Sequence, residues 1–164
     1  MIFAHSGARS SELRSLKKSN VNLHNQEYTV LIKKGNQYKE TKKVILKSVM
    51  YLWEEVIGEA DDDQYLFGPH FIPGDQEMHR QTITKYWYRH VKNGKIKDED
   101  GELLDVQADF YALKHALLDS LPPEVARILA SHTTMSTTAI YQVNKEKRER
   151  QRLKDLDFNM LRVV

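Results

Sequence analysis

Two β-favouring runs within an otherwise helical pattern constrain the fold of this chain most strongly. Residues 27–34 (EYTVLIKK) and 38–46 (YKETKKVIL) are rich in Val, Ile, Tyr and Thr, and Gly35-Asn36-Gln37 between them predicts a hairpin. A lone hairpin is barely stable in water, so it must pack on helices. The chain is therefore predicted to have an α+β fold that is mainly helical, with one small antiparallel β-sheet.

Apolar residues at three- and four-residue spacing predict helices on both sides of the hairpin. The predicted segments are an opening helix around 7–16, a helix over 47–57 that ends at Gly58, a helix over 76–91, a run from Asp109 to Leu121, a restart at Pro122-Pro123, and a highly charged helix that begins near Asn144. A Thr/Ser-rich turn precedes this last helix. Residues 1–164 are expected to form one domain, with 142–164 as its C-terminal tail helix.

Composition excludes several classes of protein. The chain has no cysteine, so a disulfide framework and a thiolate metal site are both excluded. No apolar run approaches the roughly 20 residues that cross a bilayer, and the start lacks the features of a secretory signal, so we expect a cytoplasmic protein. His70, His79 and His90 follow no metal-binding spacing, and the polar loop 92–105 lacks most ligands of a calcium site. We therefore expect no metal and no other cofactor.

The charges are unevenly distributed along the chain. The net charge is only +2, but residues 1–49 hold 10 Lys/Arg against 3 Asp/Glu, residues 50–110 hold 6 against 14, and residues 111–164 hold 9 against 6. The basic first and last thirds would suit a phosphate-binding face if folding brings them together. A patchy, solvated surface explains the charges alone equally well.

The segment SGARSSELRSL near the start of the chain places Arg9 where a helix begins. A guanidinium can hold two phosphate oxygens at once in a planar fork. Glu12 lies one helical turn further on and could orient Arg9 or cap the helix. Arg9 is therefore a candidate phosphate ligand.

The segment ASHTTMSTTAIY near the other end places His132 nine residues before Tyr141. A free tyrosine hydroxyl has a pKa of about 10, so it needs cationic neighbours and a proton acceptor to act as a nucleophile at neutral pH. Taken alone, the pair could also be a tyrosine that ends a buried helix and a histidine that caps one. Its occurrence together with the Arg9 motif favours the catalytic interpretation.

Together these motifs resemble those of the tyrosine recombinases, the phage integrase family, over the span from about Gly7 to Tyr141. The resemblance implies a recombinase-like catalytic domain in which Tyr141 is the nucleophile, Arg9 contacts the scissile phosphate, and His132 either assists proton movement or binds the phosphate. The segment DFYALKHALLDSL occupies the place of the family's His-x-x-Arg box. Tyr111 stands there for the histidine and Lys114 for the second arginine, which marks a variant subgroup, and His115 follows as a histidine often does.

The family also uses a lysine from a β-hairpin turn to protonate the departing 5′ oxygen. Lys34, immediately before Gly35, matches this position best, and Lys33 and Lys39 remain alternatives because the strand register is not fixed by sequence. The residues expected to contact DNA are Arg9, Lys33, Lys34, Lys39, Lys114 and His115.

The resemblance implies site-specific cutting and rejoining of double-stranded DNA through a 3′-phosphotyrosine intermediate, as in the recombination and integration of mobile elements. It also implies self-association on DNA, with four subunits in the family's synapse. We expect residues 1–164 to be a fragment that lacks the family's core DNA-binding domain. Two alternatives stay open: a DNA-binding remnant that has lost catalysis, and a strand transferase similar to type IB topoisomerases.

Overall fold

The computed structural model describes residues 1–154 and confirms a mainly helical α+β fold with one antiparallel sheet. The α-helices are α1 (Ile2–His5), α2 (Ser10–Arg14), α3 (Met50–Gly58), α4 (Thr82–Trp87), α5 (Ala112–Ser120), α6 (Pro123–Ala130), α7 (Met135–Ala139) and α8 (Lys145–Lys154). Short 3-10 helices span Lys18–Asn20, Lys47–Val49 and Pro69–Phe71, and α4 continues as a π-helical stretch, Tyr88–Lys92. No helix within residues 1–154 is long and apolar enough to cross a membrane.

The predicted hairpin is present as β2 (Glu27–Lys34) and β3 (Gln37–Val44), joined by a turn at Gly35 and Asn36. A third strand, β1 (Val21–Asn22), pairs with the start of β2, giving the order β1-β2-β3. The sequence did not predict this strand because two residues carry no alternating pattern. Tyr28, Val30 and Ile32 of β2 are buried, so one face of the hairpin packs on the helices as its marginal stability requires.

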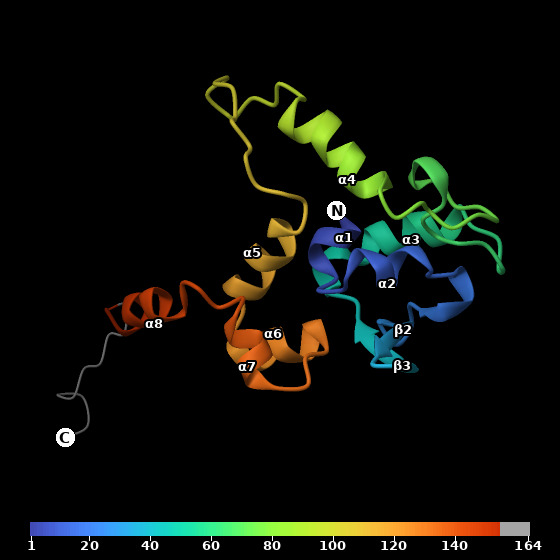
Figure 1. Cartoon of the computed structure of the whole chain (residues 1–164), viewed down its shortest axis with the longest axis horizontal. Helices are drawn as coiled ribbons and strands as arrows, with labels where there is room; N and C mark the ends of the chain where they lie inside the picture. The colour runs from blue at the N-terminus through green and yellow to red at the C-terminus, as the bar shows by residue number, and fades with distance from the viewer. Residues whose placement is uncertain (155–164) are drawn as a thin grey trace.

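The core consists of two apolar clusters that meet near the start of α3. The larger one joins α1, α2, the sheet and α3, with Leu13, Tyr28 and Trp53 almost fully buried. The smaller one lies between α5 and α6, around Leu118. Leu46 packs against both clusters, so the two parts form one continuous body. Figure 1 shows α5, α6 and α7 grouped beside α1, α2 and the hairpin, with α8 at the outer edge.

For the helix predicted over residues 76–91, the predicted start is wrong. It begins at Thr82, because the preceding residues continue an extended segment: Tyr65 bridges to Gly74, and the backbone N–H of Met78 donates to the carbonyl of Phe67 at 3.3 Å. The Thr/Ser-rich turn also differs from its prediction, because it contains α7. Thr134 caps α7 by accepting the backbone N–H of Thr137 at 3.4 Å.

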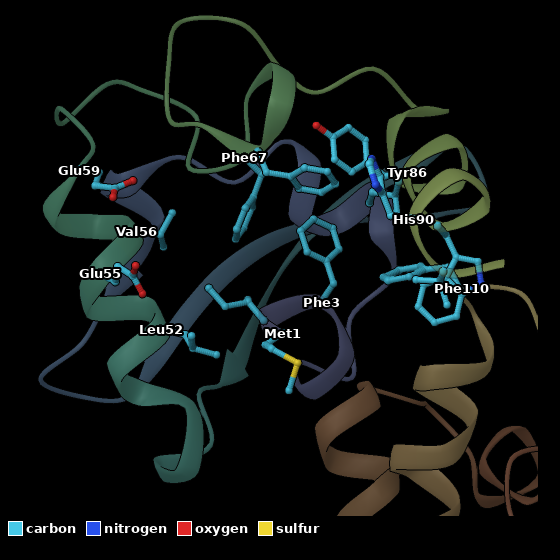
Figure 2. Close-up of a pocket in the computed structure, with 15 residues that line it drawn as sticks. Met1, Phe3, Leu52, Glu55, Val56, Glu59, Phe67, Tyr86, His90 and Phe110 are labelled. Carbon is cyan, nitrogen blue, oxygen red and sulfur yellow. The ribbon is translucent and has the colours of Figure 1, made fainter. Parts of the chain in front are cut away.

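An apolar pocket of about 470 Å³ lies between α1, α3 and α4. Figure 2 shows Phe3, Phe67, Tyr86 and Phe110 on its wall. Phe110 is the only residue of the three motif segments that lines it, and none of the candidate catalytic residues does. The candidate chemistry is therefore separate from this pocket.

Candidate active site

Arg9 lies at the N-cap of α2, and Glu12 fixes it there. The carboxylate of Glu12 accepts the backbone N–H of Arg9 through Oε2 at 3.0 Å, and Oε1 lies 3.6 Å from Nη1 of the same arginine. The carboxylate is 7% exposed, whereas the Arg9 side chain is 56% exposed. Glu12 thus holds the base of Arg9 from inside the fold and leaves the guanidinium accessible, as the spacing predicted.

Gly7 brings the Arg9 motif into contact with α6. Its φ is +62°, and a Cβ atom at this position would lie 2.8 Å from Cγ and 3.0 Å from the carbonyl oxygen of Leu129. Only glycine allows this conformation and this close approach together. Leu129 is three residues before His132, so the contact sets the two distant motifs side by side.

Helix α5 carries the variant box. Tyr111 lies at its N-cap and is 42% exposed, whereas Lys114 is 6% exposed. The ammonium of Lys114 lies 5.8 Å from the ring centroid of Tyr111 and 5.7 Å from that of Tyr141. The His115 ring packs on the Tyr141 ring, with centroids 4.4 Å apart. One turn of helix therefore presents a tyrosine, a lysine and a histidine to Tyr141.

His132 follows α6 after Ser131, which adopts the left-handed conformation that ends the helix. Its Nδ1 lies 3.1 Å from Oγ1 of Thr138, a fully buried residue of α7. The His132 ring lies 5.2 Å from the Tyr141 ring between centroids. The sequence did not point to Thr138, whose hydroxyl orients the imidazole through its contact with Nδ1.

Tyr141 follows α7, and its hydroxyl lies 2.8 Å from the hydroxyl of Tyr111. The next residue, Gln142, is buried and donates from Nε2 to the carbonyls of Leu118 and of Leu121, the latter at 3.2 Å. These bonds fix the backbone beside Tyr141 to the end of α5. The candidate nucleophile is thus rigidly attached to the helix that carries its neighbours.

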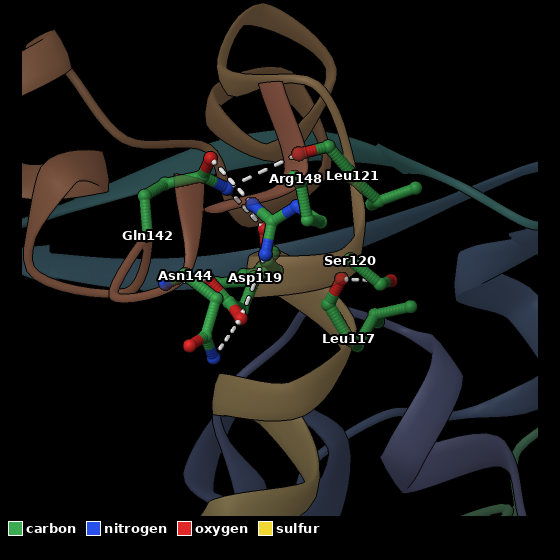
Figure 3. A network of polar contacts seen from close by, with 8 residues as sticks. Leu117, Asp119, Ser120, Leu121, Gln142, Asn144 and Arg148 are labelled. Carbon is green, nitrogen blue, oxygen red and sulfur yellow. Dashed lines mark hydrogen bonds and ion pairs between the residues drawn. The ribbon is translucent and has the colours of Figure 1, made fainter. Parts of the chain in front are cut away.

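The start of α8 is anchored to α5 by a polar network, shown in Figure 3. Asp119 forms an ion pair with Arg148 at 2.8 Å and accepts the side-chain amide of Asn144 at 3.0 Å. Partial burial would raise the pKa of Asp119, but these hydrogen bonds outweigh it and lower the pKa. The charged helix predicted to begin near Asn144 is present as α8, and residues 155–164 of the predicted tail lie outside the described part.

The electrostatics of the site are those of a partly desolvated cationic cluster. Burial lowers the pKa of Lys114 to about 8; Glu12 opposes this change, and Lys43 and Arg9 reinforce it. Burial also lowers the pKa of His132 to about 4, helped by the positive charges of Lys114, Lys43 and Arg9. At neutral pH the imidazole is therefore neutral, whereas most of the Lys114 population is charged.

The structure describes fewer contacts for the three hairpin lysines than for the groups around Tyr141. The backbone of Lys34 pairs with Gln37 at the end of the hairpin, and the predicted role of its side chain falls outside what the structure describes. Lys33 is exposed, with Nζ 6.0 Å from the ring centroid of Tyr38. Lys39 is exposed and pairs with buried Ile32, so it shares a face with the core side of β2.

One functional candidate escaped sequence reasoning altogether. Lys43 of β3 is 2% exposed, and its Nζ lies 3.6 Å from Oε2 of Glu12. The signal that could have found it is strand alternation, because Lys43 pairs directly with buried Tyr28 and so faces the core. Among the described residues, no group of three or more His, Asp or Glu side chains could hold a metal ion.

Comparison with solved structures shows the same fold in DNA recombinases. XerA recombinase matches with a TM-score of 0.67 and 19% identity, covering 96% of this chain and 57% of that protein. The Tn1549 transposon integrase in complex with transposon right end DNA matches with a TM-score of 0.64 and 18% identity, covering 93% and 57%. XerH site-specific recombinase bound to palindromic difH substrate matches with a TM-score of 0.56 and 20% identity, covering 93% and 43%.

The chain thus spans between 43% and 57% of the length of these proteins. No curated protein gives a significant match to it. At the level of sequence families, residues 1–148 match the Phage integrase family. With nine-tenths of its length matched and the recombinase catalytic-domain fold in place, this chain belongs to the phage integrase family of tyrosine recombinases.

Proposed function

We propose that this chain is the catalytic domain of a recombinase or integrase that cuts and rejoins DNA through a 3′-phosphotyrosine link to Tyr141. The observation that carries the proposal is the convergence on Tyr141 of groups from two separate segments, the start of α5 and the turn after α6. Its hydroxyl contacts that of Tyr111, and its ring packs against His115 and His132. Lys114 lies on the same ring.

In the proposed reaction, the Tyr141 oxygen attacks a DNA phosphate in line and forms the P–O bond of a phosphotyrosine, while the bond to the 5′ oxygen breaks. Arg9 and Lys114 hold the non-bridging oxygens and stabilise the charge of the transition state. The imidazole of His132 is neutral and so has a lone pair that can accept the proton that Tyr141 loses, but its lowered pKa makes it a weak base. Lys34 remains the proposed donor of the proton that the departing 5′ oxygen gains, on the family resemblance.

The contact with Tyr141 also suggests a role for Tyr111. Only one of two facing hydroxyls donates at a time, and once Tyr141 has lost its proton, Tyr111 is necessarily the donor. Its pKa rises to about 12, first through burial and then through this hydrogen bond, so it keeps its proton. We infer that Tyr111 stabilises the Tyr141 phenolate by donating this hydrogen bond.

Rejoining follows from the same chemistry. The covalent intermediate retains the energy of the broken bond, so a 5′ hydroxyl from another strand can attack it and release Tyr141 without ATP. Relatives of this fold are solved with DNA bound, which supports double-stranded DNA as the partner. We propose that copies of the chain associate on DNA for strand exchange, and that a further DNA-clamping domain contributes affinity.

The test is covalent trapping on a nicked DNA substrate whose short 5′ fragment diffuses away after cleavage. The substrate is used at high concentration, because a chain of half the usual length has fewer phosphate contacts. The wild-type chain should give a protein–DNA band that Tyr141→Phe abolishes and Tyr111→Phe weakens. The absence of a covalent band with the wild-type chain would favour a DNA-binding remnant. DNA relaxation without strand exchange would favour a function similar to that of type IB topoisomerases.

A further inference from the structure

Lys43 is a buried cation without a hydrogen-bond partner. It lies on β3, and its ammonium side chain is fully buried. An ammonium carries three donors, yet within the described residues Nζ has no hydrogen-bond acceptor. It forms an ion pair with Glu12, whose Oε2 lies 3.6 Å away, beyond hydrogen-bond distance.

Folding alone does not explain a lysine at this position. Burial lowers the pKa of Lys43, because taking an ammonium out of water disfavours its charged form, and Glu12 only partly offsets this cost. The neighbouring Lys42 behaves ordinarily: it is 71% exposed and paired with Glu27 at 2.9 Å. An apolar side chain of similar length at position 43 would fill the same space without the desolvation cost.

The groups around Glu12 explain what a charge at position 43 does in return for its desolvation cost. Its carboxylate is shared between Arg9, through Nη1 at 3.6 Å and the backbone N–H at 3.0 Å, and the ammonium of Lys43. If Lys43 were absent, Arg9 would be the nearest counter-ion of a buried carboxylate, and attraction would draw its guanidinium inward. With Lys43 present, the carboxylate is balanced and the group of three keeps one net positive charge.

The charge of Lys43 also reaches the rest of the site. It is among the charges that lower the pKa of Lys114 and of His132, so all these groups share one electrostatic environment. Lys114 additionally faces Glu12 and Arg9, and its ammonium lies over the rings of Tyr111 and Tyr141.

We propose that Lys43 is a positioning residue for DNA cleavage: its buried ammonium balances Glu12, so that the guanidinium of Arg9 stays available to the scissile phosphate. This inference rests on the proposed function. It adds a third cation, from β3, to the two that the motifs supplied, and it assigns that cation an indirect role through Glu12.

The experiment compares Lys43→Met with Lys42→Met, its exposed neighbour on the same strand. Lys43→Met should lower the cleavage rate at saturating DNA by about tenfold or more, as is usual for residues that orient a catalytic group, with little change in the DNA concentration giving half-maximal rate. Lys42→Met should stay within about twofold of wild type. Circular dichroism and urea unfolding of each variant verify that it is folded.

A double variant separates positioning from mere packing. In Lys43→Met with Glu12→Gln the unbalanced carboxylate is gone, so the double variant should recover part of the rate lost in Lys43→Met. A packing role predicts the opposite, a further loss. The pH profile provides a second readout: removing the like charge of Lys43 should move the alkaline limb that Lys114 controls to higher pH.

The outcomes distinguish the two proposals. A wild-type chain that forms no covalent adduct would overturn the proposed function and this inference together. A wild-type chain that forms the adduct, with Lys43→Met cleaving as fast as Lys42→Met, would overturn the role of Lys43 alone. That role is likewise overturned if the double variant loses activity additively and the alkaline limb does not move.

Discussion

Because Lys114 is proposed to hold the scissile phosphate, we predict that DNA cleavage is sensitive to alkaline pH. Because burial lowers the pKa of Lys114 to about 8, the ammonium is about 90% protonated at pH 7 and about 10% protonated at pH 9. Only the protonated form stabilises the negative charge of the transition state. The rate through Lys114 should therefore fall roughly tenfold between these two pH values.

The assay is the second-order rate constant of covalent adduct formation at subsaturating DNA, which reports on groups of the free protein. Lys114→Arg is the matched control, because a guanidinium stays charged across the range. If arginine fits poorly, its rate is lower at every pH, so only the shapes of the two profiles are compared. Deprotonation of the nucleophile affects both proteins alike. Wild-type and Lys114→Arg profiles that superimpose through pH 9 after scaling would refute the reasoning.

Three further predictions concern stability, measured by urea unfolding. Lys114→Met should stabilise the fold by on the order of 2 kcal/mol at pH 7, because the folded-state pKa lies below the ordinary 10.5 and burying the charge is unfavourable; equal or lower stability would contradict this. Gly7→Ala should destabilise by about 1–3 kcal/mol, because φ is +62° and the added Cβ meets Leu129; a neutral effect would contradict the close approach. His132 has a folded-state pKa of about 4, below its ordinary 6.5, so its contribution is present above pH 6.5 and is lost as pH falls toward 4. Wild type should therefore lose on the order of 1–2 kcal/mol between pH 7 and 5, and His132→Gln should lack this loss.

Patterns that are local in the chain were predictable from sequence. The hairpin was readable because its alternation and its turn residues occur within 20 residues, and β2 and β3 form where expected. The relation between Arg9 and Glu12 is likewise local, a spacing of three across a helix start. The charged helix after Tyr141 was found from composition and begins one residue from its predicted start.

Features that depend on packing between distant segments were not predictable. Lysines are rarely buried, so nothing in the sequence separates Lys43 from exposed Lys42 until β3 is paired with Tyr28. The contact between the hydroxyls of Tyr111 and Tyr141 joins residues 30 positions apart and requires α5, α6 and α7 to be packed first. The late start of α4 arises from the pairing of Tyr65, which no periodicity in residues 76–91 reveals.

The central claim is that the Tyr141 oxygen forms the bond to DNA, and peptide mapping of the trapped adduct tests it most directly. Tyr111 is an internal control, because its hydroxyl lies only 2.8 Å from that of Tyr141 and competes for the same phosphate. After protease and nuclease digestion, mass spectrometry should locate the nucleotide on the peptide that contains Tyr141. A nucleotide on the Tyr111 peptide, or an adduct that persists in Tyr141→Phe, would contradict the account.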